Sequence, residues 1–237
     1  MQSPSDPGKP LLKLRLWVDL QPRPAPENMA FDEAMLLAAE EPWLRVYGWQ
    51  QPSLSIGFSQ PLTVVPTERS AWPVVRRWTG GGVVVHDGDW TYTLAVPASW
   101  PLSQEGAGLI YRMVHEALIA ALDRAGLTGG ELQPESTSNG MGVCFVEPAR
   151  YDVVWRGRKI AGAAQRRAKG NLLHQGSVQG IELPTNFAAL LAAELAHEVV
   201  CEESQAVELR LRESAAVLVA NKYGWPEWLT DRKSAAS

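Results

Sequence analysis

Three short segments of the sequence combine glycines, cations and histidines in ways that suit binding of an anionic ligand. Residues 76–87 read RRWTGGGVVVHD, so two arginines precede three consecutive glycines and a histidine follows them. Glycines let the backbone approach a ligand closely, and arginines pair with carboxylate or phosphate groups. The same pattern also fits a plain glycine turn with solvated arginines. The flanking Arg76, Arg77 and His86 favour a binding site.

The other two segments place polar residues next to small ones. Residues 157–167 read GRKIAGAAQRR, and residues 171–177 read NLLHQGS. Small side chains at 161–164 leave room for a ligand beside a strand that Lys159 enters. Each residue taken alone has a simpler explanation, because a lysine in a turn is usually solvated and a single histidine such as His174 is more often structural than catalytic.

Two cysteines in 237 residues exclude a disulfide framework, and no Cys/His cluster has metal-ligand spacing. We therefore predict no metal site and a reducing, cytoplasmic environment. An isolated cysteine is usually a small buried hydrophobe, but Cys144 lies in the sequence VCFVEP and is a candidate catalytic thiol. Cys201 lies in an Ala/Glu/Leu-rich run that predicts a helix, and we interpret it as structural.

Hydrophobic periodicity predicts a strand-rich half followed by a helix-rich half. Helices are expected after Asn28, whose residue type caps helices, at 104–125 before Gly126, and through much of 186–222. A turn at 156–157 is expected to join two strands, and 128–140 is expected to be a loop. The predicted strands are 11–20, 44–47, 53–58, 74–77, 82–86, 91–96, 143–146, 151–155, 159–164 and 172–178. Without regular βαβ alternation, this pattern predicts an α+β fold, with helices packed on a mixed or antiparallel sheet.

Length and composition limit the remaining possibilities. A chain of 237 residues with 46% hydrophobic residues can bury one large core. We therefore predict a single domain at 11–237, with a helical C-terminal segment from about residue 186. The tail at 1–10 is expected to be disordered. The net charge of −4 disfavours nucleic-acid binding. No signal peptide or membrane-spanning run is recognisable, so we expect no membrane association.

Taken in order, these motifs resemble the lipoate–protein ligase and octanoyltransferase family. The resemblance rests on Asn28-Met29-Ala30 with Asp32-Glu33, the RRxTGGGxVxHD and GRKIAGAAQRR segments, and the LHQGS segment, and it covers residues 13–180. It implies the catalytic fold shared with biotin protein ligases, and transfer of a medium-chain acyl group to a lysine of a lipoyl domain. The VCFVEPARYD sequence at 143–152 resembles the CFxxPxxYE/D element of cysteine-dependent octanoyltransferases, in which the cysteine is the nucleophile.

The resemblance implies site residues and partners. Cys144 and Lys159 would be catalytic, the acyl donor would be octanoyl-acyl carrier protein, and the acceptor would be the glycine cleavage H protein or a 2-oxoacid dehydrogenase E2. Arg76 or Arg77 would meet the pantetheine phosphate or the acidic carrier, with Arg166 and Arg167 as further docking cations. His86 or His174 would accept the proton of the acceptor lysine. The implied substrate-binding residues are Arg76, Arg77, Thr79, Gly80, Gly81, Gly82, His86, Gly162, Ala163, Ala164, His174 and Gly176.

Alternatives to the transferase remain open. The uninterrupted glycines at 80–82 are typical of ATP-dependent lipoate ligases, which form lipoyl-AMP, whereas the transferases typically carry an arginine within this run. A transferase would need no cofactor, whereas a ligase would need ATP and Mg²⁺. A non-catalytic acyl-binding protein and a biotin ligase are further alternatives, both disfavoured by the motifs. The acyl preference, octanoyl or lipoyl, stays open, and we expect a monomer.

Overall fold

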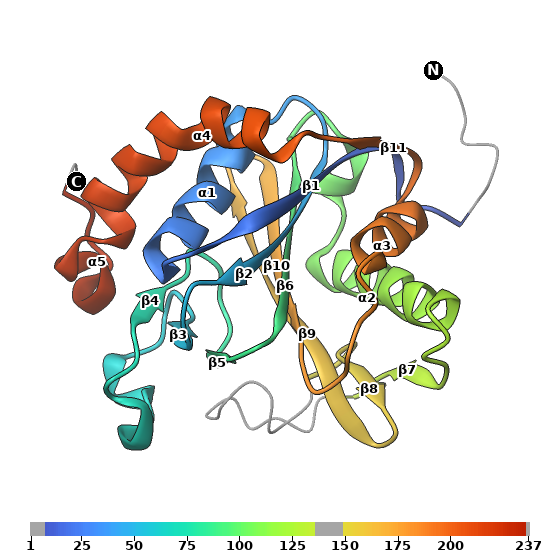
Figure 1. Cartoon of the computed structure of the whole chain (residues 1–237), viewed down its shortest axis with the longest axis horizontal. Coiled ribbons are helices and arrows are strands. Elements are labelled where there is room, and N and C mark those ends of the chain that lie inside the picture. The colour runs from blue at the N-terminus through green and yellow to red at the C-terminus, as the bar shows by residue number, and fades with distance from the viewer. Residues whose placement is uncertain (1–7, 136–148, 236–237) are drawn as a thin grey trace.

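A large mixed sheet forms the centre of the computed structural model, which describes residues 8–135 and 149–235 (Figure 1). Within these residues the sheet has eight strands in the order β11-β1-β2-β6-β10-β9-β8-β7. Strand β1 runs parallel to β2 and β11, and the other neighbours are antiparallel. The strands are β1 (Leu11–Arg23), β2 (Trp43–Trp49), β6 (Trp90–Val96), β7 (Gly130–Leu132), β8 (Val153–Trp155), β9 (Arg158–Ala168), β10 (Asn171–Val178) and β11 (Ala196–Cys201).

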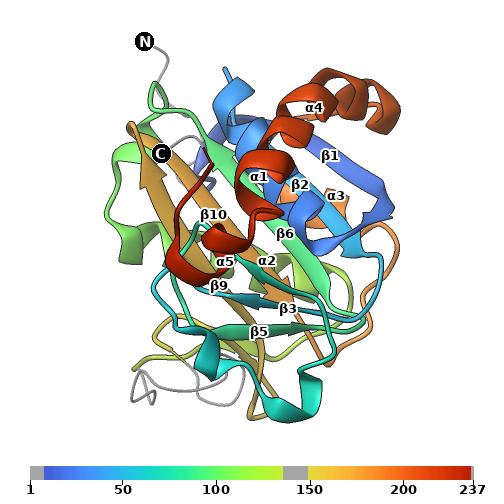
Figure 2. The same ribbon diagram turned by 90° about the vertical axis from the view of Figure 1, so that its left-hand side faces the viewer.

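A second, smaller sheet carries the glycine-rich segment. Its strands, in the order β4-β3-β5, are β4 (Val74–Arg76), β3 (Ser53–Ile56) and β5 (Val83–His86). Figure 2 shows β3 and β5 side by side, crossing the direction of the long strands of the main sheet. The segment at 77–82 joins β4 to β5, and its residues Trp78 and Thr79 contact β9 and β10 of the main sheet.

Helices cover both faces of the main sheet, with α1 and α4 on one face and α2 and α3 on the other (Figure 1). Successive strand residues point to opposite faces. Accordingly Leu16 packs in the α2/α3 core and Trp17 in the α1/α4 core. The helices are α1 (Ala25–Ala38), α2 (Ala107–Arg124), α3 (Phe187–Leu195), α4 (Ser204–Leu218) and α5 (Pro226–Asp231), and a π-helical segment (Val219–Tyr223) follows α4.

The α+β fold predicted from the sequence is confirmed, as are several of its local signals. Arg156 and Gly157 form the turn between β8 and β9, with φ values of 51° and 74°. Two successive residues with positive φ are typical of the tight turn that fits the twist of a hairpin. Gly126, with φ of 81°, follows the end of α2, because glycine adopts the left-handed conformation that ends a helix without steric cost.

Three local predictions are wrong. Helix α1 begins at Ala25, so Asn28 lies inside it, where its amide donates to the Gly48 carbonyl and accepts from Arg45 instead of capping the helix. Part of the expected loop at 128–140 is strand β7, which pairs with β8. Residues 196–201, expected to be helical, form β11, so Cys201 ends an edge strand and is exposed.

Other expectations fall outside the described residues. These are most of the tail at 1–10, the end of the 128–140 loop, the strand at 143–146 and Cys144. Over the part of the chain that the structure describes, no helix is both long enough and apolar enough to cross a membrane.

Candidate active site

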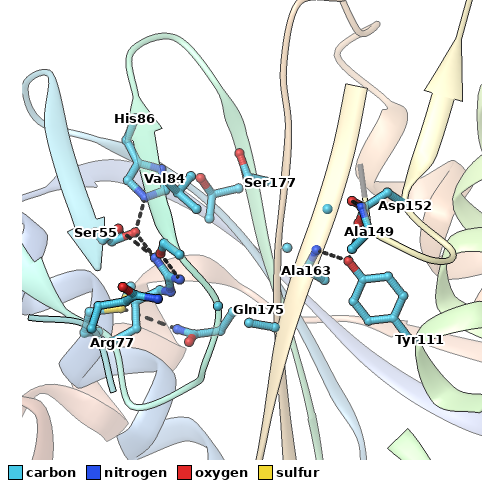
Figure 3. A pocket seen from close by; sticks show the side chains of 18 of the residues that line it. Ser55, Arg77, Val84, His86, Tyr111, Ala149, Asp152, Ala163, Gln175 and Ser177 are labelled. Carbon is cyan, nitrogen blue, oxygen red and sulfur yellow. Dashed lines mark hydrogen bonds between the residues drawn. The ribbon is translucent and has the colours of Figure 1, made fainter. Parts of the chain in front are cut away.

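A cavity of about 320 Å³ lies between the small sheet and strands β9 and β10 of the main sheet (Figure 3). Strand β3, the glycine-rich segment, β5, β9, β10 and helices α1 and α2 all contribute to its wall. Nine of the residues selected from the sequence line it, although they come from three separate segments. They are Arg77, Gly81, Gly82, His86, Lys159, Gly162, Ala163, Ala164 and Gly176.

Four selected residues do not line this cavity, namely Arg76, Thr79, Gly80 and His174. Gly80 lines a neighbouring hollow that shares Gly81 and Ala163 with the cavity. Cys144 lies outside the described residues.

The two adjacent arginines have different environments. Arg76 is completely buried, and its guanidinium donates to backbone carbonyls of Gly57, Phe58 and Leu229. These bonds join the glycine-rich segment to α5, and they leave Arg76 no surface for the expected phosphate or carrier contact. Arg77 points the other way, because successive strand residues face opposite sides.

Arg77 holds the glycine-rich segment at the edge of the cavity. Its guanidinium donates to the carbonyls of Gly80 at 3.0 Å and Gly82 at 2.9 Å, and to both the carbonyl and the hydroxyl of Ser55. A Cβ atom on Gly57 would lie 1.9 Å from the Gly81 carbonyl oxygen. Glycine is therefore required at 57 for this segment to pack against β3.

Thr79 and the glutamine of the LHQGS segment connect the glycine-rich segment to α1. The Thr79 hydroxyl donates to Gln175 Oε1 at 2.7 Å, and Gln175 Nε2 donates to Asp32 Oδ2 at 2.7 Å. Asp32 also pairs with the buried Arg45. A buried charge is tolerated only when it is paired and hydrogen-bonded. Thr79 therefore supports the cavity from behind and does not reach its surface.

One side of the cavity is lined by Ser55, Arg77 and His86, and Asp89 supports His86 from behind. We call these four residues the histidine wall. His86 Nε2 lies 2.6 Å from Ser55 Oγ, and His86 Nδ1 lies 2.8 Å from Asp89 Oδ2. The ring of Trp49 stacks on the imidazole, with centroids 3.7 Å apart. Both ring nitrogens of His86 therefore have partners, and one ring face is covered.

His86 and Asp89 of the histidine wall differ in their charge at neutral pH. Burial lowers the pKa of His86, against the opposing effect of Asp89 and with a smaller contribution from Arg77. Burial alone would raise the pKa of Asp89, but His86 and the hydroxyls of Ser177 and Thr91 together lower it. Asp89 is thus ionised at neutral pH while His86 is neutral.

The opposite side is formed by Tyr111, Asp152, Lys159 and Ala163, which we call the lysine wall. Lys159 Nζ forms an ion pair with Asp152 at 2.7 Å, and both side chains are buried. The Tyr111 hydroxyl donates to Asp152 at 2.5 Å and accepts from the Ala163 amide at 2.7 Å. Burial raises the pKa of Tyr111 well above its usual range, and Asp152 raises it further, so the hydroxyl keeps its proton. Figure 3 shows Tyr111, Asp152 and Ala163 across the cavity from Ser55, Arg77 and His86.

His174 lies behind the cavity and not in it. It is completely buried, with Nδ1 3.0 Å from Gln165 Nε2 and Nε2 3.4 Å from the Tyr92 hydroxyl. Burial lowers its pKa well below the ordinary value, and His115 contributes. Of the two histidines named from the sequence, only His86 is in the cavity wall.

The expected docking cations in β9 differ in accessibility. Arg166 is half-buried, packs against the rings of Phe58 and Trp78, and donates to the Trp78 carbonyl. Arg167 is exposed and donates to the backbone carbonyls of Ser103 and Glu105, in the segment before α2.

Sequence reasoning missed four residues of the two walls, namely Ser55, Asp89, Tyr111 and Asp152. Asp152 carries a local signal, because it ends the YD pair of the VCFVEPARYD element. Ser55, Asp89 and Tyr111 have none, since each is an ordinary polar residue of a strand, a turn or a helix. Only the pairing of β3 with β5 brings Ser55 beside His86.

Within the described ranges 8–135 and 149–235, no group of three or more His, Cys, Asp or Glu side chains is arranged to hold a metal ion. The cations of the site are the side chains of Arg77 and Lys159.

Two octanoyltransferases resemble this chain in sequence. Octanoyltransferase LipM of Kyrpidia tusciae is 34% identical over 165 residues, and that of Geobacillus kaustophilus is 36% identical over 166 residues. In each case the match covers 64% of this chain and 60% of the relative. The chain therefore spans less than two thirds of the length of these relatives.

A solved structure and a family model extend the comparison. Thermoplasma acidophilum protein Ta0514 with bound lipoic acid superposes with a TM-score of 0.67 at 20% identity, covering 92% of this chain and 99% of that one. At this identity the likeness concerns the fold. The model of the lipoyl protein ligase A/B catalytic domain matches residues 24–207, which include both walls of the cavity. This chain belongs to the lipoyl protein ligase A/B catalytic domain family.

Proposed function

We propose that the protein transfers an octanoyl or lipoyl group from acyl carrier protein to a lysine of a lipoyl-domain protein, through a thioester on Cys144. The observation that carries the proposal is the placement of Lys159, held by Asp152, in the wall of a cavity that is also lined by small residues. The identity of 34–36% with octanoyltransferases supports the reaction class. The role of Cys144 rests on the sequence.

The cavity suits a single acyl chain. Its volume of about 320 Å³ is at the lower end of the range of roughly 300–1,000 Å³ for small-molecule sites. Gly162, Ala163 and Ala164 of β9 face the glycine-rich segment across the cavity. Gly176 also lines it, but a Cβ atom there would lie 2.2 Å from Tyr92, so packing alone already requires this glycine.

Lys159 has the chemistry needed at the acyl carbonyl. Negative charge develops on the carbonyl oxygen in both tetrahedral intermediates, first when the thiolate attacks and then when the lysine amine attacks. A buried cation beside that oxygen stabilises both transition states. The ion pair with Asp152 fixes the ammonium at one position before substrate binds, which reduces reorganisation during the reaction.

His86 is the base that the cavity offers. The acceptor lysine attacks in its neutral amine form, the minor form at neutral pH because its pKa is near 10.4, and the nitrogen must lose one further proton as the C–N bond forms. A neutral imidazole can accept this proton, and ionised Asp89 stabilises the imidazolium that forms. His174 has no access to the cavity surface, so we assign this role to His86 alone.

Intact mass spectrometry tests the proposal directly. Incubation with octanoyl-acyl carrier protein is expected to add one octanoyl group to the protein, and the Cys144→Ala variant is expected to remain unmodified. The Cys201→Ala variant is the matched control and should acylate normally. A wild-type protein that gains no acyl group would overturn the transferase proposal.

The ligase alternative is favoured by one observation, the uninterrupted glycines at 80–82. It would use free lipoate with ATP and Mg²⁺, whereas the transferase needs no cofactor. Lipoyl-domain modification from free lipoate that requires ATP and persists in Cys144→Ala would establish it. For either reaction we propose the glycine cleavage H protein or a 2-oxoacid dehydrogenase E2 as acceptor. The protein is proposed to act as a monomer.

A further inference from the structure

The end of the chain contacts the glycine-rich segment, although it does not line the cavity. We call residues 219–231, which comprise the π-helical segment and α5, the C-terminal segment; it lies beyond residues 24–207, which the family model matches. Helix α5 lies beside β4 (Figure 1), where Arg76 Nε donates to the Leu229 carbonyl at 2.9 Å and Trp228 Nε1 donates to the Arg76 carbonyl at 3.0 Å. The residue that precedes the glycine-rich segment is thus bonded to α5 in both directions.

Lys222 of the C-terminal segment makes a second contact, with the ring of Trp78. Its Nζ atom lies 4.0 Å from the centroid of that ring, and Arg166 Cζ lies 4.9 Å from the same centroid. Among aromatic rings the indole attracts cations most strongly, and the attraction is larger when the pair is removed from water. Lys222 is only 8% exposed, so its contact with Trp78 is of this stronger kind.

Helix α1 fixes the position of Lys222. Glu33 Oε2 accepts from Lys222 Nζ and from the Tyr223 hydroxyl, each at 2.5 Å, and all three residues are buried. A buried ammonium needs such a partner, because an unpaired charge away from water is costly. The preceding residue of α1, Asp32, supports Thr79 through a glutamine of β10. Two consecutive carboxylates of α1 therefore support two consecutive residues of the glycine-rich segment.

These attachments precede the glycines that form part of the cavity wall. Gly81 and Gly82 line the cavity, and glycine can adopt more backbone conformations than other residues. Their positions therefore depend on the anchored residues beside them. Arg77 anchors the segment to β3 through Ser55, and Trp78 anchors it to the C-terminal segment.

We propose that Lys222 is a positioning residue for the acyl-binding site, because by holding Trp78 it keeps Gly81 and Gly82 in the cavity wall. The proposal rests on the proposed acyl transfer. Loss of the Lys222 ammonium should weaken binding of the acyl group and leave the lysine wall, which acts at the carbonyl, unchanged. Losing an interaction that stabilises bound substrate and transition state equally raises KM without lowering kcat. The C-terminal segment thus completes the acyl-binding site from outside the matched domain.

Steady-state kinetics of octanoyl transfer separate binding from chemistry. Lys222→Met removes the ammonium and keeps a side chain of similar length. With saturating lipoyl domain, its KM for octanoyl-acyl carrier protein should rise about tenfold, while kcat changes less than about threefold. Lys222→Arg keeps the cation and should recover most of the wild-type KM. Lys233→Met is the matched control, because Lys233 is an exposed lysine close to the C-terminal segment.

A double variant separates the contact with Trp78 from the effect of an unpaired carboxylate. Removing one partner of a buried ion pair is strongly destabilising, whereas replacing both partners can be nearly neutral. Glu33→Gln/Lys222→Met should therefore fold even if Lys222→Met does not. Its KM should rise as far as that of the single variant, because the cation at Trp78 is lost in both.

Hydrogen exchange reports the position of the glycine-rich segment without any turnover. The amides of Gly57 and Phe58 donate to the carbonyls of Gly82 and Thr79, at 3.2 and 2.8 Å. In the Lys222→Met and double variants these two amides should exchange at least about fivefold faster than in wild type, because local opening of the segment exposes them. Exchange in β10 should be unchanged.

Three outcomes would overturn the proposal. One is an unchanged KM in the double variant, and another is a fall in kcat at constant KM, which would place Lys222 in the chemical step. The third is faster exchange of equal size in β10, which indicates a loss of global stability. Wild-type protein that transfers no acyl group would instead contradict the proposed function, and the exchange comparison would still decide the role of Lys222.

Discussion

The two walls of the cavity differ in the charge state of their central residue, a neutral histidine in one and a lysine cation in the other. In the histidine wall, burial keeps His86 neutral, with Asp89 bonded to its Nδ1 atom and Arg77 as a second charged neighbour. In the lysine wall, Lys159 and Asp152 remain a close ion pair at 2.7 Å, supported by Tyr111. A neutral group can take up a proton, whereas a fixed cation can stabilise an oxyanion. The comparison therefore assigns proton transfer to one wall and carbonyl stabilisation to the other.

Removing the cation of the lysine wall should have the largest effect. Lys159→Ala is expected to slow both enzyme acylation and transfer by about 10³-fold, as loss of an oxyanion donor does. Quenched-flow measurement of each half-reaction checks this, with Arg158→Ala as control because Arg158 is the exposed neighbour on β9. Slowing of only one half-reaction would contradict a shared role at the carbonyl.

Removing the base of the histidine wall should slow only the second half-reaction. His86→Asn is expected to reduce transfer to the lipoyl domain by about 100-fold. The fraction of neutral amine falls steadily as pH decreases, and because burial lowers the pKa of His86, protonation of His86 should add a further, steeper fall in the wild-type transfer rate only below about 6.5, the ordinary histidine value. This acidic limb should vanish in His86→Asn and persist in His197→Asn, which changes an exposed histidine of β11. An unchanged pH profile in His86→Asn would exclude His86 as the base.

A smaller effect is expected from the residue that supports the ion pair. Tyr111→Phe removes a hydrogen bond to Asp152 and the acceptor of the Ala163 amide. We expect kcat to fall about fivefold, corresponding to roughly 1 kcal/mol for one hydrogen bond, with KM nearly unchanged. A rise in KM at constant kcat would instead place Tyr111 in substrate binding.

The smallest effect concerns the histidines behind the cavity. Burial lowers the pKa of His115 to about 4, so the unfolded chain binds more protons below the ordinary value of about 6.5 and stability falls as pH falls through that value. Because of His115, the free energy of unfolding should fall by about 1 kcal/mol between pH 6.5 and pH 5.5. Urea titrations at the two pH values measure it. His115→Asn, which keeps a donor for the Tyr151 carbonyl, should reduce the loss; an identical loss would contradict this source.

Local patterns were sufficient where neighbouring residues decide the structure. The turn at Arg156 and Gly157, the end of α2 at Gly126 and most strands follow from short-range signals. Strand β11 does not, because its Ala-Glu-rich surroundings favour a helix and the strand exists through pairing with β1, which is far away in sequence. Long-range pairing overrides local propensity in this case.

The candidate site shows the same division. The sequence identified the small residues, the glycines and Lys159, but it could not separate Arg76 from Arg77. Strand geometry turns Arg76 toward α5 and Arg77 toward the cavity. The sequence likewise could not choose between His86 and His174 as the base, because burial of His174 depends on packing against Tyr92 and Gln165.

The sequence by itself determined the family, the α+β fold and the segments that carry the chemistry, because motifs and periodicity are properties of neighbouring residues. Tertiary structure alone decided how these segments meet. The pairing of β3 with β5 places Ser55 beside His86, and the crossing of the small sheet over β9 and β10 sets His86 opposite the lysine wall. Hydrogen bonds between distant strands create these contacts, and no local pattern encodes them.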